Sequence, residues 1–93
     1  MRTIDHTTQF KRDYKREKKS GCHKKFDHDL LSVVKLLASD KPLAHRNYDH
    51  ALTGEWKDHR DCHIKPDLVL IYRKPDSDTL TLVRLGSHSE LGL

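Results

Sequence analysis

The chain has 93 residues, of which 34% are hydrophobic and 34% charged, and it carries a formal net charge of +4. A chain of this length builds one modest core, so we expect one domain over residues 1–93, without room for separate cofactor and substrate domains. No apolar run approaches a membrane span, no signal peptide is recognisable, and the two cysteines form no Cys-x-x-Cys pair. We therefore expect a cytoplasmic protein without a membrane partner.

The amino-terminal quarter is expected to contain a short strand and a basic helix. Residues 2–6 favour the strand, and Thr7 or Thr8 suits the N-cap of a helix that runs to Ser20 and ends at Gly21. Between positions 11 and 25, two acidic residues stand against eight basic ones: Lys11, Arg12, Lys15, Arg16, Lys18, Lys19, Lys24 and Lys25. Such a surface attracts polyanions, above all nucleic acid. An acidic protein partner and an ordinary solvated helix face are the alternative interpretations.

A second helix is expected from Lys24 to Ser39. Its apolar residues recur at spacings of three and four, as one buried helix face requires: Phe26, Leu30, Val33, Val34 and Leu37. Pro42 lies just beyond and cannot continue the helix. Residues 40–55 are expected to form a loop.

The second half is expected to supply three strands. Residues 56–64 alternate, residues 68–72 form an unbroken apolar run typical of a strand buried on both faces, and residues 79–85 form the last strand. A tail with one helical turn follows. The order β-α-α-β-β-β predicts an α+β fold in which two helices pack on one face of a mainly antiparallel sheet. The opposite face is then open for a ligand.

The alternating segment 56–64 distributes its side chains over two faces. One face carries His59, Asp61 and His63, and the other carries Arg60, Cys62 and Ile64. A zinc site is not favoured, because the spacing of His59 and His63 suits a helix face in a segment that is expected to be a strand, and the adjacent Cys62 and His63 point to opposite faces. A cysteine nucleophile is not favoured either, since Cys62 is expected to face inward. The sequence therefore predicts neither a metal nor another cofactor.

The eight histidines fall into two groups. Four are expected to be surface residues: His6, His23, His28 and His45. The other four lie where the loop, the strand ends and the tail converge: His50, His59, His63 and His88. Metal-free RNA cleavage needs a base for the 2′-hydroxyl, an acid for the leaving 5′-oxygen and a cation for the transition state. Arg84 and His88 suit two of these roles, with surface ion pairs as the alternative.

Three ordered motifs resemble the YafQ branch of the RelE/ParE toxin superfamily. They are residues 48–56 (Tyr-Asp-His-Ala-Leu-Thr-Gly-Glu-Trp), residues 60–72 (Arg-Asp-Cys-His through Pro-Asp to Tyr) and residues 84–91 (Arg-Leu-Gly-Ser-His-Ser-Glu-Leu). The resemblance covers the second half densely and the two helices only in pattern. It departs from the family where Ala51 replaces a common proline and Gly92 replaces a common aromatic residue.

The resemblance implies a RelE-like microbial ribonuclease fold and a ribosome-dependent endoribonuclease that cuts mRNA in the ribosomal A site. It further implies a toxin of a type II toxin–antitoxin system, monomeric alone and hetero-oligomeric with a DinJ/RelB-like antitoxin. It assigns catalysis to His50, His63, Asp67, Arg84 and His88. His88 would be the general acid, Asp67 or His63 the base or its orienting group, and Arg84 the cation. His50 would contact the scissile phosphate or share the acid–base work.

Further RNA contacts are expected outside this catalytic group. The basic helix would offer Lys11, Arg12, Lys15, Arg16, Lys18 and Lys19, to ribosomal RNA or to an acidic antitoxin segment. Trp56 would stack on a base or fill the core, Leu91 would supply apolar contact, and Arg60 would bind phosphate although its register turns it from the His59/His63 face. A ParE-like toxin that inhibits gyrase and an RNA-binding module without chemistry are the alternatives of the same fold.

Overall fold

The computed structural model describes residues 1–21 and 25–93. Its elements in chain order are β1 (Thr3–His6), α1 (Thr8–Ser20), α2 (Phe26–Ala38), η1 (His45–Asn47), β2 (His50–Ala51), η2 (Gly54–Trp56), β3 (Arg60–Lys65), β4 (Leu68–Arg73), β5 (Thr79–Gly86) and α3 (His88–Leu91). The predicted surface position of His23, the charge of Lys24 and the predicted helix start at Lys24 lie outside the described residues. Within the described part of the chain, no helix is long and apolar enough to cross a membrane.

The five strands form one sheet in the order β1-β5-β4-β3-β2. β1 runs parallel to β5, and the other three pairs are antiparallel. The central strand β4 is buried on both faces, as its unbroken apolar run predicts. The predicted α+β class and the mainly antiparallel sheet are therefore confirmed.

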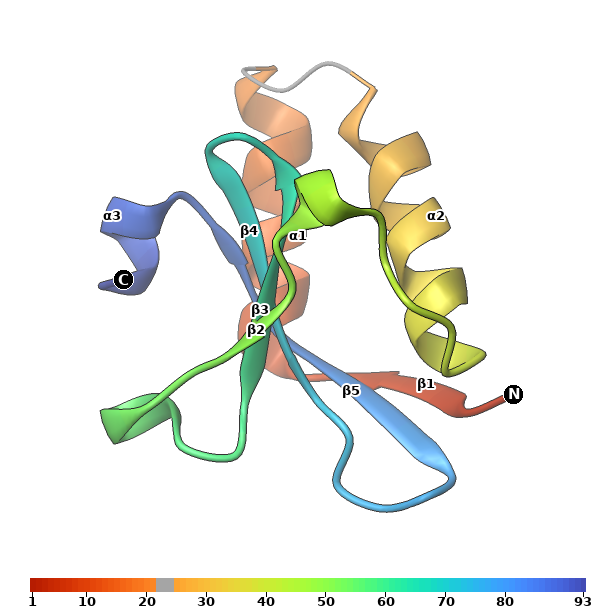
Figure 1. Cartoon of the computed structure of the whole chain (residues 1–93). Helices are drawn as coiled ribbons and strands as arrows, with labels where there is room; N and C mark the ends of the chain where they lie inside the picture. Colours follow the sequence, from red (N-terminus) through yellow and green to blue (C-terminus); the bar gives the residue numbers. More distant parts are fainter. Residues whose placement is uncertain (22–24) are drawn as a thin grey trace.

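The sheet carries a different hydrophobic cluster on each face. α2 lies on one side of the sheet and α3 on the other (Figure 1). The large cluster joins α1 and α2 to the alternate residues of β3, β4 and β5 that face them, including Cys62, Leu70 and Leu85. The small cluster covers Val69 and Ile71 on the opposite face with Leu91, Leu52, Trp56 and Val83.

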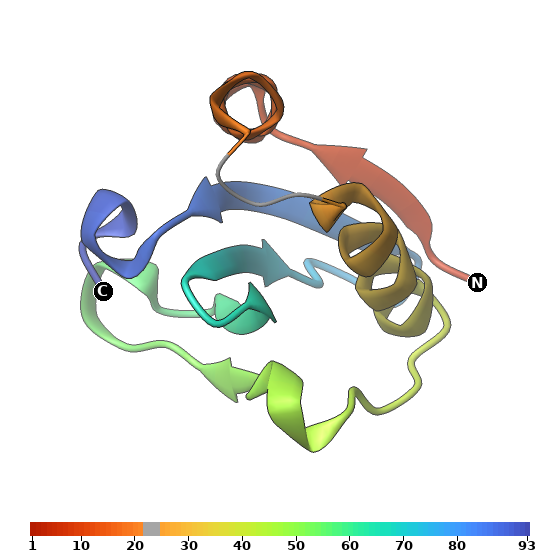
Figure 2. The same ribbon diagram turned by 90° about the horizontal axis from the view of Figure 1, so that it is seen from above.

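α1 closes the edge of the sheet where β1 ends. Thr7 caps this helix by accepting a hydrogen bond from the Phe10 amide, and Gly21 ends it with a left-handed φ of 67°, as predicted. Seen from above, α1 stands beside the edge formed by β1 and β5 (Figure 2). Beyond β1, the Thr7 hydroxyl donates to the carbonyl of Val83 at 2.7 Å, and the Leu85 amide donates to Asp13 at 3.1 Å. These bonds satisfy backbone groups that an open edge would expose.

The segment before β3 differs from the prediction. The expected loop over residues 40–55 contains two short 3₁₀ helices and β2, which pairs with β3. The expected strand start at Trp56 is wrong, because β3 begins at Arg60 and Trp56 ends η2. Left-handed residues at Gly54 and Asp58 fold this segment back, so that Trp56 packs on the small cluster instead of extending the strand.

Candidate active site

Two rows of cross-strand neighbours define the open face of the sheet. His50 pairs with Asp61, Asp61 with Ile71, and Ile71 with Arg84. In the next row, His63 pairs with Val69 and Val69 with Gly86, two residues before His88. Directly opposed residues of neighbouring strands point to the same side. The face opposite α2 therefore carries His50, Asp61, His63 and Arg84, and we call it the histidine face.

Four of the five predicted catalytic side chains form a cluster at the histidine face, and the fifth, Arg84, lies on the same face with its guanidinium bound to α1. The rings of His63 and His88 lie 5.0 Å apart between centroids, and Asp67 Oδ1 lies 3.3 Å from His88 Nδ1. The ring of Tyr48 contacts both His50 and His63, with centroid distances of 5.0 Å and 5.7 Å. Segments up to 40 positions apart in the chain thus contribute to one cluster.

His50 and His88 are each held by a contact to the ring nitrogen Nδ1. His50 Nδ1 lies 3.0 Å from the Tyr48 carbonyl oxygen, to which it donates, so its Nε2 is left for another partner. His88 is the first residue of α3, whose N-cap Ser87 forms a capping box with Glu90. Asp67 holds the Nδ1 side of His88, and its Nε2 is likewise left for another partner.

Asp61 is a buried carboxyl beneath these histidines. It is 2% exposed, and Oδ1 lies 2.9 Å from His50 Nδ1. The contact lacks hydrogen-bond geometry, since Nδ1 of His50 is directed to Tyr48, and it is an ion pair only where His50 is protonated. Oδ1 of Asp61 has no hydrogen-bond partner in the described structure. Burial raises the pKa of Asp61, and the nearby His50, His63 and His88 offset this only in part. The alternation of the sequence predicts the correct face for Asp61, but no pattern in the sequence marks it as a site residue.

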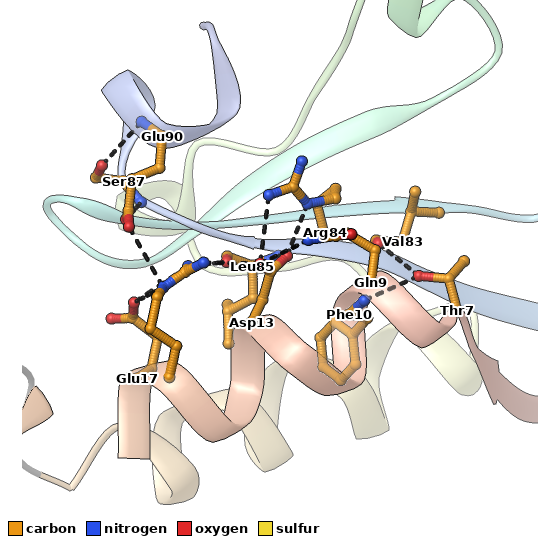
Figure 3. A network of polar contacts seen from close by, with 11 residues as sticks. Thr7, Gln9, Phe10, Asp13, Glu17, Val83, Arg84, Leu85, Ser87 and Glu90 are labelled. Atoms are coloured by element: carbon orange, nitrogen blue, oxygen red, sulfur yellow. Dashed lines mark hydrogen bonds and ion pairs between the residues drawn. The ribbon is translucent and has the colours of Figure 1, made fainter. Parts of the chain in front are cut away.

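Arg84 occupies the same row as His50 and Asp61, but its guanidinium is bound to α1. Its Nε donates to Asp13 Oδ2 at 2.7 Å and its Nη2 to Oδ1 at 3.3 Å (Figure 3). Burial by itself would raise the pKa of Asp13, but the hydrogen bonds from Arg84 and Leu85 and the charges of Arg84 and Arg16 hold it below its ordinary value. In the sequence, Asp13 is one of two acidic residues among the basic residues of positions 11–25, and nothing there predicts its contact with Arg84.

Fewer basic side chains of α1 are free to bind RNA than the sequence predicts, because two of them form ion pairs within the protein. Lys11, Arg12, Lys15 and Lys19 are exposed. Lys18 is exposed as well, but its ammonium pairs with Asp27 at 2.7 Å. Arg16 pairs with Asp13, Glu17 and Glu90 and donates to the carbonyl of Leu85, so its charge is neutralised within the fold.

Three other predicted RNA contacts lie away from the cluster or in the core. Arg60 pairs in register with Tyr72 on the α2 side of the sheet and donates to Asp49. It therefore faces away from the histidine face, as its predicted register indicates, and not toward a phosphate bound there. Leu91 is 5% exposed and packs in the small cluster, so it cannot offer an apolar surface to RNA. Trp56 is half-buried against the same cluster and contacts His59.

The remaining candidates for chemistry are limited by geometry. Cys62 is buried in the large cluster on the α2 side, and burial raises the pKa of its thiol. Among the described residues, no group of three His, Cys, Asp or Glu side chains is arranged to hold a metal ion. The histidines, Asp61, Asp67 and Arg84 are therefore the groups that can act on a ligand at this face.

The fold and the site define a small α+β protein with an acid–base cluster on an open sheet face. The family described as bacterial toxin of type II toxin–antitoxin system, YafQ, matches residues 2–92, and the chain belongs to this family. The predicted family resemblance is thereby confirmed.

Relatives and solved structures agree with this assignment. A YafQ toxin of Haemophilus influenzae is 37% identical over 93 residues, covering 97% of this chain and 91% of its own. The mRNA interferase toxin YafQ of Escherichia coli K12 is 34% identical over 91 residues, which cover 98% of this chain and 96% of the relative. A copper-bound mutant toxin from Helicobacter pylori superposes with a TM-score of 0.88 at 41% identity, covering 98% and 99%. YafQ in the E. coli DinJ–YafQ complex superposes with a TM-score of 0.83 at 35% sequence identity, and the match covers 98% of both chains.

Proposed function

We propose that this protein is a cytoplasmic endoribonuclease that cleaves mRNA in the ribosomal A site by acid–base catalysis. The E. coli relative is named an mRNA interferase, which supports the reaction class. The single observation that carries the proposal is the contact of His63 with His88, whose Nδ1 is held by Asp67. Two imidazoles at this separation can both reach one phosphodiester.

The roles follow from which atoms are free. His88 acts as the general acid, because Asp67 occupies its Nδ1 side and leaves Nε2 to give a proton to the 5′-oxygen. His63 acts as the base for the 2′-hydroxyl. His50, which is fixed by the Tyr48 carbonyl, contacts the scissile phosphate through Nε2. Arg84 stabilises the added negative charge of the transition state.

The proposal includes a protein partner. A structure of the E. coli relative is described as a complex with DinJ, which supports a DinJ-like antitoxin for this chain. We expect a monomer when the protein is alone and a hetero-oligomer with the antitoxin. Lys11, Arg12, Lys15 and Lys19 form the exposed charge on α1 that can bind ribosomal RNA or an acidic segment of the antitoxin.

The test is primer extension on mRNA incubated with translating ribosomes and the purified protein. We expect the His88→Ala variant to cleave at least ~100-fold more slowly than the wild type, the usual effect of losing a general acid. His6→Ala, at the far edge of the sheet, is the matched control and keeps its cleavage rate. Cleavage should persist with a chelator that removes copper and zinc but spares magnesium.

Three results would overturn the proposal. Unchanged cleavage by the His88→Ala variant would remove His88 from the reaction. Cleavage that stops with the chelator and returns with copper would show that a metal takes part. Intact mRNA together with inhibition of gyrase in a supercoiling assay would favour the ParE-like alternative.

A further inference from the structure

Asp13 is a fully buried carboxylate in a helix whose exposed surface is basic. It is 0% exposed and accepts hydrogen bonds from Arg84, from the Leu85 amide and from Arg16 Nη1 at 2.9 Å. A buried ion pair is expensive to desolvate, and an apolar residue of similar size often gives equal or greater stability. The Leu85 amide needs one acceptor here, which a neutral side chain such as asparagine could also supply, so the fold requires an acceptor at this position but not a charge.

The contacts divide the Arg84 guanidinium into a held side and a free side. Asp13 takes the Nε and Nη2 donors in a two-point contact, which fixes the plane of the guanidinium. The third nitrogen, Nη1, has no hydrogen-bond partner in the described part of the chain and points away from Asp13 (Figure 3). The Arg84 side chain is 23% exposed. Among the described residues, the buried side-chain polar atom without a partner is Asp61 Oδ1, so Arg84 Nη1 is not fully buried and a ligand can reach it.

The sheet register places Arg84 on the histidine face. Arg84 stands in one row with His50 and Asp61, two strands from Asp61. A β-bulge at Val83 shifts the register of β5 at this point, and such bulges commonly re-aim a side chain. Val83 packs in the small cluster on the same face.

We propose that Asp13 is a positioning residue that aims Arg84 Nη1 at a non-bridging oxygen of the scissile phosphate. This inference rests on the proposed function of the same site. Asp13 touches no substrate and acts only through Arg84. The ion pair holds the guanidinium in place before RNA arrives, so no ordering cost is added during the reaction.

The test is a double-mutant cycle with Asp13→Asn, Arg84→Ala and the double variant. Steady-state cleavage on programmed ribosomes gives kcat and KM, and urea unfolding gives the stability of each variant. If Asp13 acts through Arg84, the Asp13→Asn variant lowers kcat at least ~10-fold with little change in KM, whereas the same change in the Arg84→Ala background costs less than ~2-fold. A merely structural role would slow both backgrounds equally.

Two further variants keep the test decisive. Asp27→Asn breaks the ion pair with Lys18 elsewhere on the helices and is the matched control, with unchanged cleavage expected. If Asp13→Asn fails to fold, Arg84→Lys replaces it: lysine can still pair with Asp13 but has no second nitrogen to offer. We expect this variant to be as slow as Arg84→Ala, and wild-type cleavage would overturn the inference.

The inference and the proposed function fail in different ways. If the wild type and the His88→Ala variant cleave alike, the proposed function fails. If His88→Ala is inactive but the Asp13→Asn effect persists in the Arg84→Ala background, only the positioning role of Asp13 is wrong.

Discussion

Asp61 shows at the scale of single residues how the site works against stability. Its carboxyl is 2% exposed, and Oδ1 lacks a hydrogen bond within the described structure. Burial disfavours the ionised form and raises its pKa, while the histidines beside it favour that form. A group with a raised pKa binds its proton more tightly in the folded state, so stability falls as pH rises from the unfolded pKa through the folded one.

We therefore predict that Asp61→Asn makes the protein more stable and less active. At neutral pH the variant should gain free energy of unfolding, because a neutral amide at this buried position avoids the cost of burying a carboxylate. The gain should shrink as pH falls, because the wild-type carboxyl is then protonated. Urea unfolding at neutral and acidic pH, with cleavage assays on the same samples, measures both effects.

Asp58→Asn is the control for this prediction. Asp58 is exposed and has a left-handed φ of 69°, which asparagine tolerates well, so its stability should not change in this way. An Asp61→Asn variant that is less stable at every pH would show that the carboxylate is needed by the fold.

For single residues, the sequence predicts which face of the sheet a side chain occupies, but not which distant side chains it contacts. The alternation correctly separated Asp61 and His63 from Cys62. It could not reveal that Asp13 holds Arg84, because that contact joins positions 71 residues apart. It also left Arg16 and Leu91 among the RNA contacts, since nothing local shows that Glu90 neutralises one and the small cluster buries the other.

At the scale of elements, strong periodicity predicted well and short elements did not. α2 and β4 follow directly from their apolar patterns, and Gly21 ends α1 as expected. β2 has only two residues, which is too short for any period, and its pairing with β3 is decided by tertiary contacts. The expected helical turn in the tail is present as α3, and its capping box explains why four residues suffice.

We predict that Ser87→Ala loosens α3 and slows cleavage. The Ser87 hydroxyl accepts from the Glu90 amide at 3.1 Å, and Glu90 Oε1 accepts from the Ser87 amide at 2.9 Å. Losing an N-cap costs about 1 kcal/mol, and a helix of one turn cannot absorb that loss. Since His88 begins this helix, cleavage should fall, and the unfolding midpoint should drop by about 4–8 °C.

Ser89→Ala and Ser87→Thr are the comparisons for this element. Ser89 is exposed on the same helix, and threonine keeps the capping hydroxyl. Cleavage rates and thermal unfolding of the three variants separate a capping effect from a general one. Equal cleavage by Ser87→Ala and Ser89→Ala would contradict the role of the cap.

The whole molecule divides stability and function between the two faces of its sheet. The large cluster contains most of the core and joins both long helices to the strands. The small cluster is built from α3 and the segment before β3, which flank the histidines. The predicted architecture had one covered face and one open face. The open face is in fact partly covered, because Trp56 and Leu91 turn onto it and support the site.

This division predicts different consequences for two leucine truncations. Leu37 of α2 is 2% exposed in the large cluster, so Leu37→Ala should cost about 2–5 kcal/mol, a large share of a total of roughly 5–15 kcal/mol. Leu91→Ala should cost about 2 kcal/mol, the low end of the range, because the chain end can relax around it. The α3 amides should then exchange hydrogen faster without global unfolding.

Cleavage should rank the two variants in the opposite order. Below its unfolding transition, folded Leu37→Ala keeps the histidine face intact and should cleave at nearly the wild-type rate per folded molecule. Leu91→Ala frees α3 from Val69 and Ile71, so His88 loses its fixed distance to His63 and cleavage falls sharply. Hydrogen exchange, urea unfolding and cleavage on the same samples test this ranking. Parallel losses of stability and activity in both variants would show that the two clusters act as one core.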